Sequence, residues 1–193
     1  NNKVNFALIS SNIPKKGIYD FFEIAKICQK NKINAEFLLI GPQNIDTKEL
    51  ARKIEKDQLK NLKILGYFEN PLEAIEKANV ILSLSHFAES FGRTVGESMA
   101  ASRPVIAYNY GAIPELIEDG VDGYLCSYKN IDEVVKCIEN LCNDISQIQI
   151  LGNNARKKIL ALSSEDVYKK AINEGIEKAL KVTKNFKDKH CIK

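Results

Sequence analysis

The chain of 193 residues has no tryptophan, one methionine and two histidines, and its hydrophobic runs are short. The longest of these runs, such as FLLI and VILSL, fall far below the ~20 apolar residues that a membrane-spanning helix needs. The start, NNKVNFALISS, lacks the basic and then apolar pattern of a signal peptide. Because Met99 is the only methionine, we expect the chain to be a piece of a longer protein.

The low net charge and the absence of cysteine and nucleotide-binding motifs argue against several functional classes. The five cysteines form no CxxC pair and no Cys/His cluster at zinc-ligand spacing, so we expect reduced, mostly buried thiols and no metal site. The net charge of +3 is small, and no basic stripe interleaved with aromatics occurs, which argues against nucleic-acid binding. There is neither a GxGxxG nor a GxxxxGK[ST] motif, so a simple dehydrogenase or ATPase is disfavoured.

Apolar segments alternate with amphipathic ones along the first 130 residues. The apolar segments are mostly continuous runs of Ile, Leu, Val and Phe, which predicts strands covered by helices on both faces. The sequence therefore predicts an α/β, Rossmann-like, doubly wound parallel sheet. We expect strands at 4–10, 35–41, 61–66, 79–85, 104–108 and 123–127, and helices at 17–31, 46–58, 71–78, 94–102 and 112–119.

The pattern after residue 130 is helical throughout. Helices are expected at 132–144, 146–162 and 163–181, with Asp132 and Ser164 as N-caps of the first and last. One domain would span residues 1–180, followed by a basic, frayed tail at 181–193. That tail could touch anionic lipid, but a solvated terminus is the favoured alternative.

The stretch HFAESFGRTVGESMAAS, residues 86–102, places two acids on either side of a glycine-led helix start. A helix N-terminus attracts phosphate, and glycine allows close approach to the backbone; Gly111 leads a second such start. Lys16 and Arg93 could meet the charge of a diphosphate. Glu89 and Glu97 would instead accept bonds from sugar hydroxyls, since carboxylates repel phosphate. This pattern favours a nucleotide sugar, with Glu97 on the ribose and Glu89 on the transferred sugar.

The block ESFGRTVGESMAASRPVIAYNYGAIPELIEDGVDGYL contains an E-x7-E arrangement and resembles the donor-binding half of retaining glycosyltransferases of family 4, which have the glycosyltransferase-B fold. PKKG, AEFLLIGP, NLKILGYFENPLEAIEKANVILSLS and GVDGYL extend the resemblance over residues 4–180. It implies that Phe91, Gly92, Arg93 and Thr94 form a backbone cradle for the phosphates, that Lys16 is the phosphate lysine, and that Tyr67 and Phe68 lie near the base. The family usually carries an arginine five residues before that lysine; this chain has Ser11. Either Arg93 compensates, or phosphate binding is weaker.

The resemblance implies a retaining hexosyltransferase that needs no cofactor and no metal. Its acceptor, a glycan or a lipid-linked sugar, would be bound by a separate N-terminal half, so this chain alone would bind donor but transfer little. We expect a cytoplasmic protein, with attachment to the inner membrane face left open, that acts in bacterial surface polysaccharide synthesis. A nucleotide-sugar-binding module without turnover and a nucleotide-sugar 2-epimerase remain as alternatives.

Four residues near the predicted site have ordinary interpretations. His86 is as consistent with a loop histidine that is hydrogen-bonded locally as with a functional one. Glu115 is expected to cap a helix, Lys15 to be solvated and Arg103 to mark the turn into a strand.

Overall fold

The computed structural model describes residues 3–163 and, beyond them, positions 169, 173 and 176. A six-stranded parallel sheet with the order β3-β2-β1-β4-β5-β6 forms its centre. The strands are β1 (Val4–Ile9), β2 (Ala35–Ile40), β3 (Leu62–Leu65), β4 (Val80–Ser83), β5 (Val105–Tyr108) and β6 (Gly123–Cys126). The predicted doubly wound, Rossmann-like fold is confirmed.

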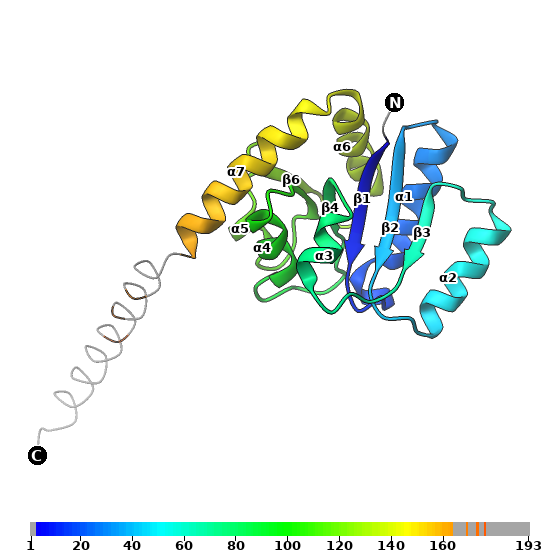
Figure 1. Ribbon diagram of the computed structural model, residues 1–193, viewed down its shortest axis with the longest axis horizontal. Helices are drawn as coiled ribbons and strands as arrows, with labels where there is room; N and C mark the ends of the chain where they lie inside the picture. Colours follow the sequence, from blue (N-terminus) through cyan, green and yellow to red (C-terminus); the bar gives the residue numbers. More distant parts are fainter. Residues whose placement is uncertain (1–2, 164–168, 170–172, 174–175, 177–193) are drawn as a thin grey trace, which may run out of the picture.

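Helices cover both faces of the sheet (Figure 1). They are α1 (Ile18–Lys30), α2 (Ile45–Lys56), α3 (Pro71–Glu76), α4 (Arg93–Ala100), α5 (Ile113–Leu116), α6 (Ile131–Asn143) and α7 (Ser146–Leu162), with a 3-10 turn η1 (Pro14–Lys16) before α1. None of the described helices is long and apolar enough to cross a membrane.

Two hydrophobic cores lie on opposite faces of the sheet because both faces of each central strand are apolar. Phe6 and Phe37 point to one core, where Phe21 of α1 and Ile138 of α6 pack. Neighbouring strand residues point to the other core, which contains Ile81 with Met99 of α4 and Ile159 of α7 among others. The continuous apolar runs of the sequence are thus buried on both faces, as expected for a parallel sheet.

Three local expectations differ from the structure or fall outside it. The N-cap of α6 is Asn130, not Asp132, because the helix begins at Ile131 and the Asn130 side chain accepts the Glu133 N–H at 3.2 Å. Helix α5 is a single turn, shorter than the expected 112–119, because Ile117 is already extended. Ser164, most of the expected helix at 163–181 and the tail at 181–193 lie outside the described residues.

The strand order reverses between β1 and β4, which lie side by side with the chain continuing to opposite edges of the sheet. Sheets of this kind bind ligands outside the carboxyl ends of the strands at that reversal. The loops after β1 and β4 are therefore the place to look for a site.

Candidate functional site

A cavity of about 530 Å³ opens at the carboxyl ends of β1 and β4. Eight of the ten predicted site residues line it: Lys16, Tyr67, Phe68, Glu89, Gly92, Arg93, Thr94 and Glu97. Phe91 and Gly111 do not line it. Phe91 is largely exposed, and Gly111 packs closely against the backbone of Glu89.

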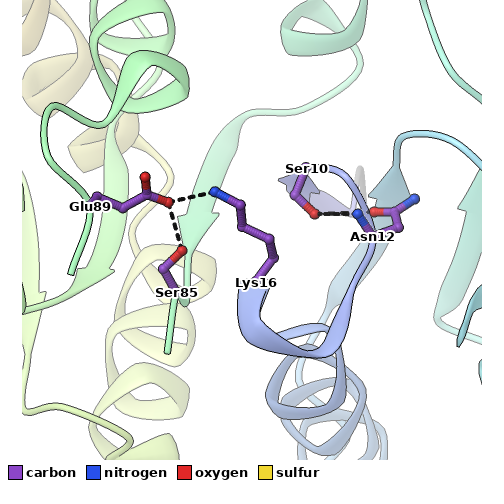
Figure 2. A network of polar contacts seen from close by, with 5 residues as sticks. All are labelled: Ser10, Asn12, Lys16, Ser85 and Glu89. Carbon is purple, nitrogen blue, oxygen red and sulfur yellow. Dashed lines mark hydrogen bonds and ion pairs between the residues drawn. The ribbon is translucent and has the colours of Figure 1, made fainter. Parts of the chain in front are cut away.

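Lys16 and Glu89 meet across the switch point of the sheet (Figure 2). The Lys16 Nζ lies 2.7 Å from Glu89 Oε1, and the Ser85 hydroxyl donates to the same oxygen at 2.7 Å. The Lys16 and Glu89 side chains are 25% and 20% exposed, so each remains open to a ligand. An ammonium has three donors, so Lys16 can hold a phosphate while it keeps Glu89. Both bonds to Glu89 end on Oε1, which leaves Oε2 to accept from a sugar hydroxyl.

Helix α4 begins beside this pair, as the sequence predicted. Its N-cap is Gly92, whose φ of 75° lies in the left-handed region that favours glycine. No side chain caps this end, and the first backbone N–H groups have no acceptor within the helix. With the positive end of the helix dipole, these groups form a binding place for an anion. The Thr94 backbone belongs to this first turn.

Arg93 and Glu97 stand one turn apart on α4. Arg93 Nη2 lies 3.5 Å from Glu97 Oε1, and the Arg93 side chain is 81% exposed. The pair is loose because an exposed ion pair in water is weak. Both groups can therefore turn toward a ligand in the cavity at little cost.

A different edge of the cavity is aromatic. Tyr67, 69% exposed, and Phe68, which packs against the core, follow β3 and line the cavity with Pro42. A flat, partly exposed aromatic surface of this kind suits the face of a nucleobase. Lys16 and Glu89 belong to the loops after β1 and β4, so the cavity extends from an aromatic rim to a charged pair.

The loop after β1 contains polar residues that the sequence analysis did not single out. Asn12 is fully buried, its backbone N–H bonds to the Ser10 hydroxyl at 2.9 Å, and its side-chain amide donates to the Pro42 carbonyl at 3.3 Å. Asn44 reaches back to the Asn12 carbonyl at 2.9 Å. This network, partly drawn in Figure 2, fixes the cavity wall near Ser11. Its only sequence signal is the SSN run directly after a strand.

The family of the chain is shown by its similarity to known proteins. Residues 1–158 match the family described as glycosyl transferases group 1. The chain belongs to this family.

Individual relatives agree with this assignment. The chain is 28% identical over 156 residues to an uncharacterized glycosyltransferase of Methanocaldococcus jannaschii, which covers 79% of this chain and 42% of that protein. It is 33% identical over 114 residues to the poly(glycerol-phosphate) alpha-glucosyltransferase of Bacillus subtilis, with 58% of this chain and 17% of that protein covered. A crystal structure of a Staphylococcus aureus TarM mutant with fondaparinux, alpha-GlcNAc-glycerol and UDP superposes with a TM-score of 0.79 at 29% identity, over 89% of this chain and 35% of that one.

The chain thus spans less than half the length of these relatives. It corresponds to the C-terminal half of a group 1 glycosyltransferase with the glycosyltransferase-B fold, as the resemblance implied. The Rossmann-like sheet and the helices α6 and α7 that follow it agree with this assignment.

The remaining sequence expectations for this glycosyltransferase domain have mixed outcomes. Glu115 lies in the first turn of α5 but makes no side-chain cap, so the expected capping role is wrong. Lys15 is exposed, although its ammonium lies 5.1 Å from the centre of the Phe87 ring. Arg103 directly precedes Pro104 and β5, as expected, and its Nε is buried without a partner among the described residues.

The thiols of the described part are free, as expected. Cys28 and Cys126 are buried, and Cys137 and Cys142 are half-buried. Burial raises the pKa of Cys28 to about 12 and that of Cys142 to about 11, so both thiols stay protonated near neutral pH. Within the described residues, no three Asp, Glu, His or Cys side chains are grouped to hold a metal ion. Cys191 lies outside the described part.

His86 has a specific partner, though not one that is near in sequence. Its Nε2 lies 2.7 Å from Asp20 Oδ2 on α1, and the Tyr108 hydroxyl at the end of β5 donates to the same oxygen at 2.6 Å. Sequence reasoning missed Asp20 and Tyr108 because the three residues come from separate segments. Only the folded sheet brings them together.

Proposed function

We propose that the chain is the donor-binding half of a retaining hexosyltransferase, and that the cavity at the switch point holds a nucleoside-diphosphate sugar. The observation that carries the proposal is the convergence of four groups on one cavity. These are the Lys16 ammonium, the uncapped N-terminus of α4, and the carboxylates of Glu89 and Glu97. Cationic groups face a diphosphate, and carboxylates face the hydroxyls on either side.

The ligand would lie across the cavity in one direction. The base would rest against Tyr67 and Phe68, and Glu97 would accept from the ribose hydroxyls. The diphosphate would lie over the first turn of α4 with Lys16 and Arg93, and the hexose would contact Glu89. The TarM relative contains UDP in its crystal structure, which supports UDP sugars as the first donors to try.

The chemistry follows from where charge develops. The bond between the anomeric carbon and the diphosphate oxygen breaks, and the nucleoside diphosphate leaves with the electron pair. A bond then forms between that carbon and the acceptor oxygen on the same face, and the acceptor proton is released. Lys16, Arg93 and the α4 N–H groups would stabilise the negative charge on the leaving diphosphate. We infer that this arrangement needs no metal ion.

We also propose a class of acceptor for the whole protein. The name of the Bacillus subtilis relative, a poly(glycerol-phosphate) alpha-glucosyltransferase, supports a cell-surface polymer or its lipid-linked precursor. The acceptor would be held by the N-terminal half, and the protein would act in the cytoplasm or at the inner membrane face, where nucleotide sugars are supplied. Bacterial surface polysaccharide synthesis is the corresponding process.

A panel of UDP-, GDP- and ADP-sugars tests the donor class. The expected result is a rise of the melting temperature with one nucleotide series, because a ligand that binds the native state stabilises it by mass action. Glu97→Ala should abolish that shift for the nucleotide sugar. A flat panel, or a Glu97→Ala variant that binds like the parent, would contradict the proposed site.

Turnover separates the proposal from its two alternatives. The two-domain protein, incubated with the bound donor, should release nucleoside diphosphate and glycosylate an acceptor, with or without chelator. Binding without any release would favour a nucleotide-sugar-binding module. Conversion of the sugar into its 2-epimer, followed by NMR spectroscopy, would favour the epimerase.

A further inference from the structure

His86 lies where four segments of the chain meet, next to the charged pair of the cavity. Its backbone N–H donates to the Lys15 carbonyl at 2.8 Å, and its carbonyl accepts from the Tyr128 hydroxyl at 3.0 Å. Its ring Nε2 reaches Asp20 on α1 at 2.7 Å. The histidine is thus attached to η1, to α1 and to the loop after β6.

One oxygen of the Asp20 carboxylate, Oδ2, accepts hydrogen bonds from both His86 and Tyr108. Tyr108, only 1% exposed, donates its hydroxyl to Oδ2 at 2.6 Å. Burial above all, together with the bond to Asp20, raises the pKa of Tyr108 above its ordinary value, so this hydroxyl keeps its proton. An ionised carboxylate only accepts, so the bond to His86 requires a proton on Nε2. The contact therefore selects the Nε2–H tautomer of the neutral ring.

The two segments that His86 connects are those that carry Lys16 and Glu89. Lys16 follows the carbonyl that accepts from His86, and Ser85, which binds Glu89, directly precedes the histidine. The segments are in close contact: a Cβ on Gly17 would lie 2.1 Å from the Leu84 carbonyl oxygen. The His86 backbone therefore links both sides of the Lys16–Glu89 pair, and the His86 ring, bonded to Asp20, anchors that backbone to α1.

We propose that His86, oriented by Asp20, is a positioning residue that sets the separation of Lys16 and Glu89 for a sugar diphosphate. It donates no proton to the substrate and touches no reacting atom. The inference rests on the proposed function, because it assigns Lys16 to the phosphate and Glu89 to the sugar. Positioning of charged groups to within about an ångström is worth large factors in binding and rate.

Two variants of similar size separate positioning from packing. His86→Gln keeps an N–H donor at a similar reach to Asp20, whereas His86→Met fills the space without a donor. His86→Met should weaken UDP-glucose binding about tenfold in calorimetry while UMP binding changes less than threefold, and His86→Gln should stay within threefold for both ligands. Equal binding of UDP-glucose by all three proteins would overturn the proposal. So would parallel losses for UMP and UDP-glucose, which indicate general disruption.

Measurements on the ligand-free chain make the inference independent of donor identity. Long-range ¹H–¹⁵N NMR correlations of the imidazole should show the Nε2–H tautomer at pH 8, with the His86 signals assigned by their loss in His86→Gln. The Nδ1–H tautomer would overturn the proposal even if His86→Met failed to fold. Amide exchange of residues 85–92 should quicken in His86→Met and not in His86→Gln; identical exchange would also overturn it.

These outcomes distinguish the two proposals. If the parent chain binds no nucleotide but the tautomer and exchange results are as expected, the proposed function is wrong, and His86 is still the residue that positions the Lys16 and Glu89 segments. If the parent chain binds UDP-glucose and His86→Met binds it equally well, the positioning role of His86 is wrong and the proposed function is unaffected.

Discussion

Lys16 and Glu89 are 73 positions apart in the chain, yet their Nζ and Oε1 atoms lie 2.7 Å from each other at the switch point of the sheet. One group attracts phosphate and the other repels it, so only the replacement of Lys16 should weaken the binding of a nucleoside diphosphate. The pair is therefore the most informative place to begin mutagenesis.

Replacing Lys16 should weaken UDP binding, and replacing Glu89 should not. Lys16→Met removes a charge-assisted contact of the kind worth roughly 1.5–3 kcal/mol, which corresponds to a loss of about ten- to a hundredfold. Glu89→Gln frees the ammonium and removes a repelling charge, so UDP affinity should stay equal or rise while transfer by the two-domain protein falls. Calorimetry with UDP measures both. A loss of UDP affinity in Glu89→Gln would contradict the assignment of Glu89 to the sugar.

Ser11 occupies the position at which family members usually carry an arginine, and it lines the cavity. Ser11→Arg should place a second cation near the diphosphate and strengthen UDP binding about tenfold, in the range of one charge-assisted hydrogen bond. Ser11→Gln adds length without charge and serves as the matched control. An equal gain of UDP affinity in both variants would mean that side-chain length, and not the positive charge, strengthens binding at this position.

Arg93 is the proposed substitute for that arginine. Arg93→Ala should weaken UDP binding about five- to tenfold at low salt, with a smaller loss at 0.5 M salt because salt screens an exposed charge. In the Ser11→Arg background the loss should shrink, since two groups that serve the same phosphate do not contribute independently. Unchanged affinity in Arg93→Ala would refute the compensation.

Gly111 is needed for close packing against the loop that carries Glu89. A Cβ there would lie 2.7 Å from the Glu89 backbone nitrogen, in a residue whose φ is +64°. Gly120 has a similar φ of +74° but open space around it, so Gly120→Ala tests backbone strain alone, about 1–2 kcal/mol. Gly111→Ala should lower the melting temperature more than Gly120→Ala and also weaken UDP-glucose binding. Equal effects on both properties would show that the contact with Glu89 does not matter.

Glu133 should make stability depend on acid pH. The Ser127 backbone N–H, the Ser127 hydroxyl and the Asn130 side chain all donate to its carboxylate, which holds the pKa of Glu133 below its ordinary value. A lowered folded-state pKa contributes stability that is present above the unfolded value, near 4.3, and is lost as pH falls through the folded value. The melting-temperature advantage of the parent over Glu133→Gln should therefore shrink as pH falls below the unfolded value and disappear below the lowered folded-state pKa. An advantage that does not change with pH would contradict this linkage.

The sequence predicted the fold well because its signals are local. Continuous apolar runs alternating with amphipathic segments indicated a parallel sheet, and the predicted strand positions agree with β1 to β6 to within a residue or two. Helix ends were less predictable where several polar residues compete for one cap. At α6, Asn130 and Asp132 could each accept a backbone N–H, and the start of the helix decided between them.

Most of the residues predicted for the site line one cavity, but their contacts could not be predicted from the sequence. Gly92 and the acids around it are close together in sequence, so the glycine-led start of α4 could be predicted directly from that stretch. Asp20, Ser85 and Tyr108 carry no such signal, because each is an ordinary polar residue until the sheet places it beside another loop.

The sequence by itself determined the parallel sheet, the glycine-led start of α4 and the set of charged groups that a sugar diphosphate would need. Apolar periodicity and glycine conformation depend on neighbouring residues, so they can be read without a fold. Only the tertiary structure decided that Lys16 meets Glu89, that Arg93 pairs loosely with Glu97 and that His86 is held by Asp20. The Lys16–Glu89 contact joins the segments that follow β1 and β4, and the His86–Asp20 contact joins the loop after β4 to α1. Both form because the strand order reverses between β1 and β4.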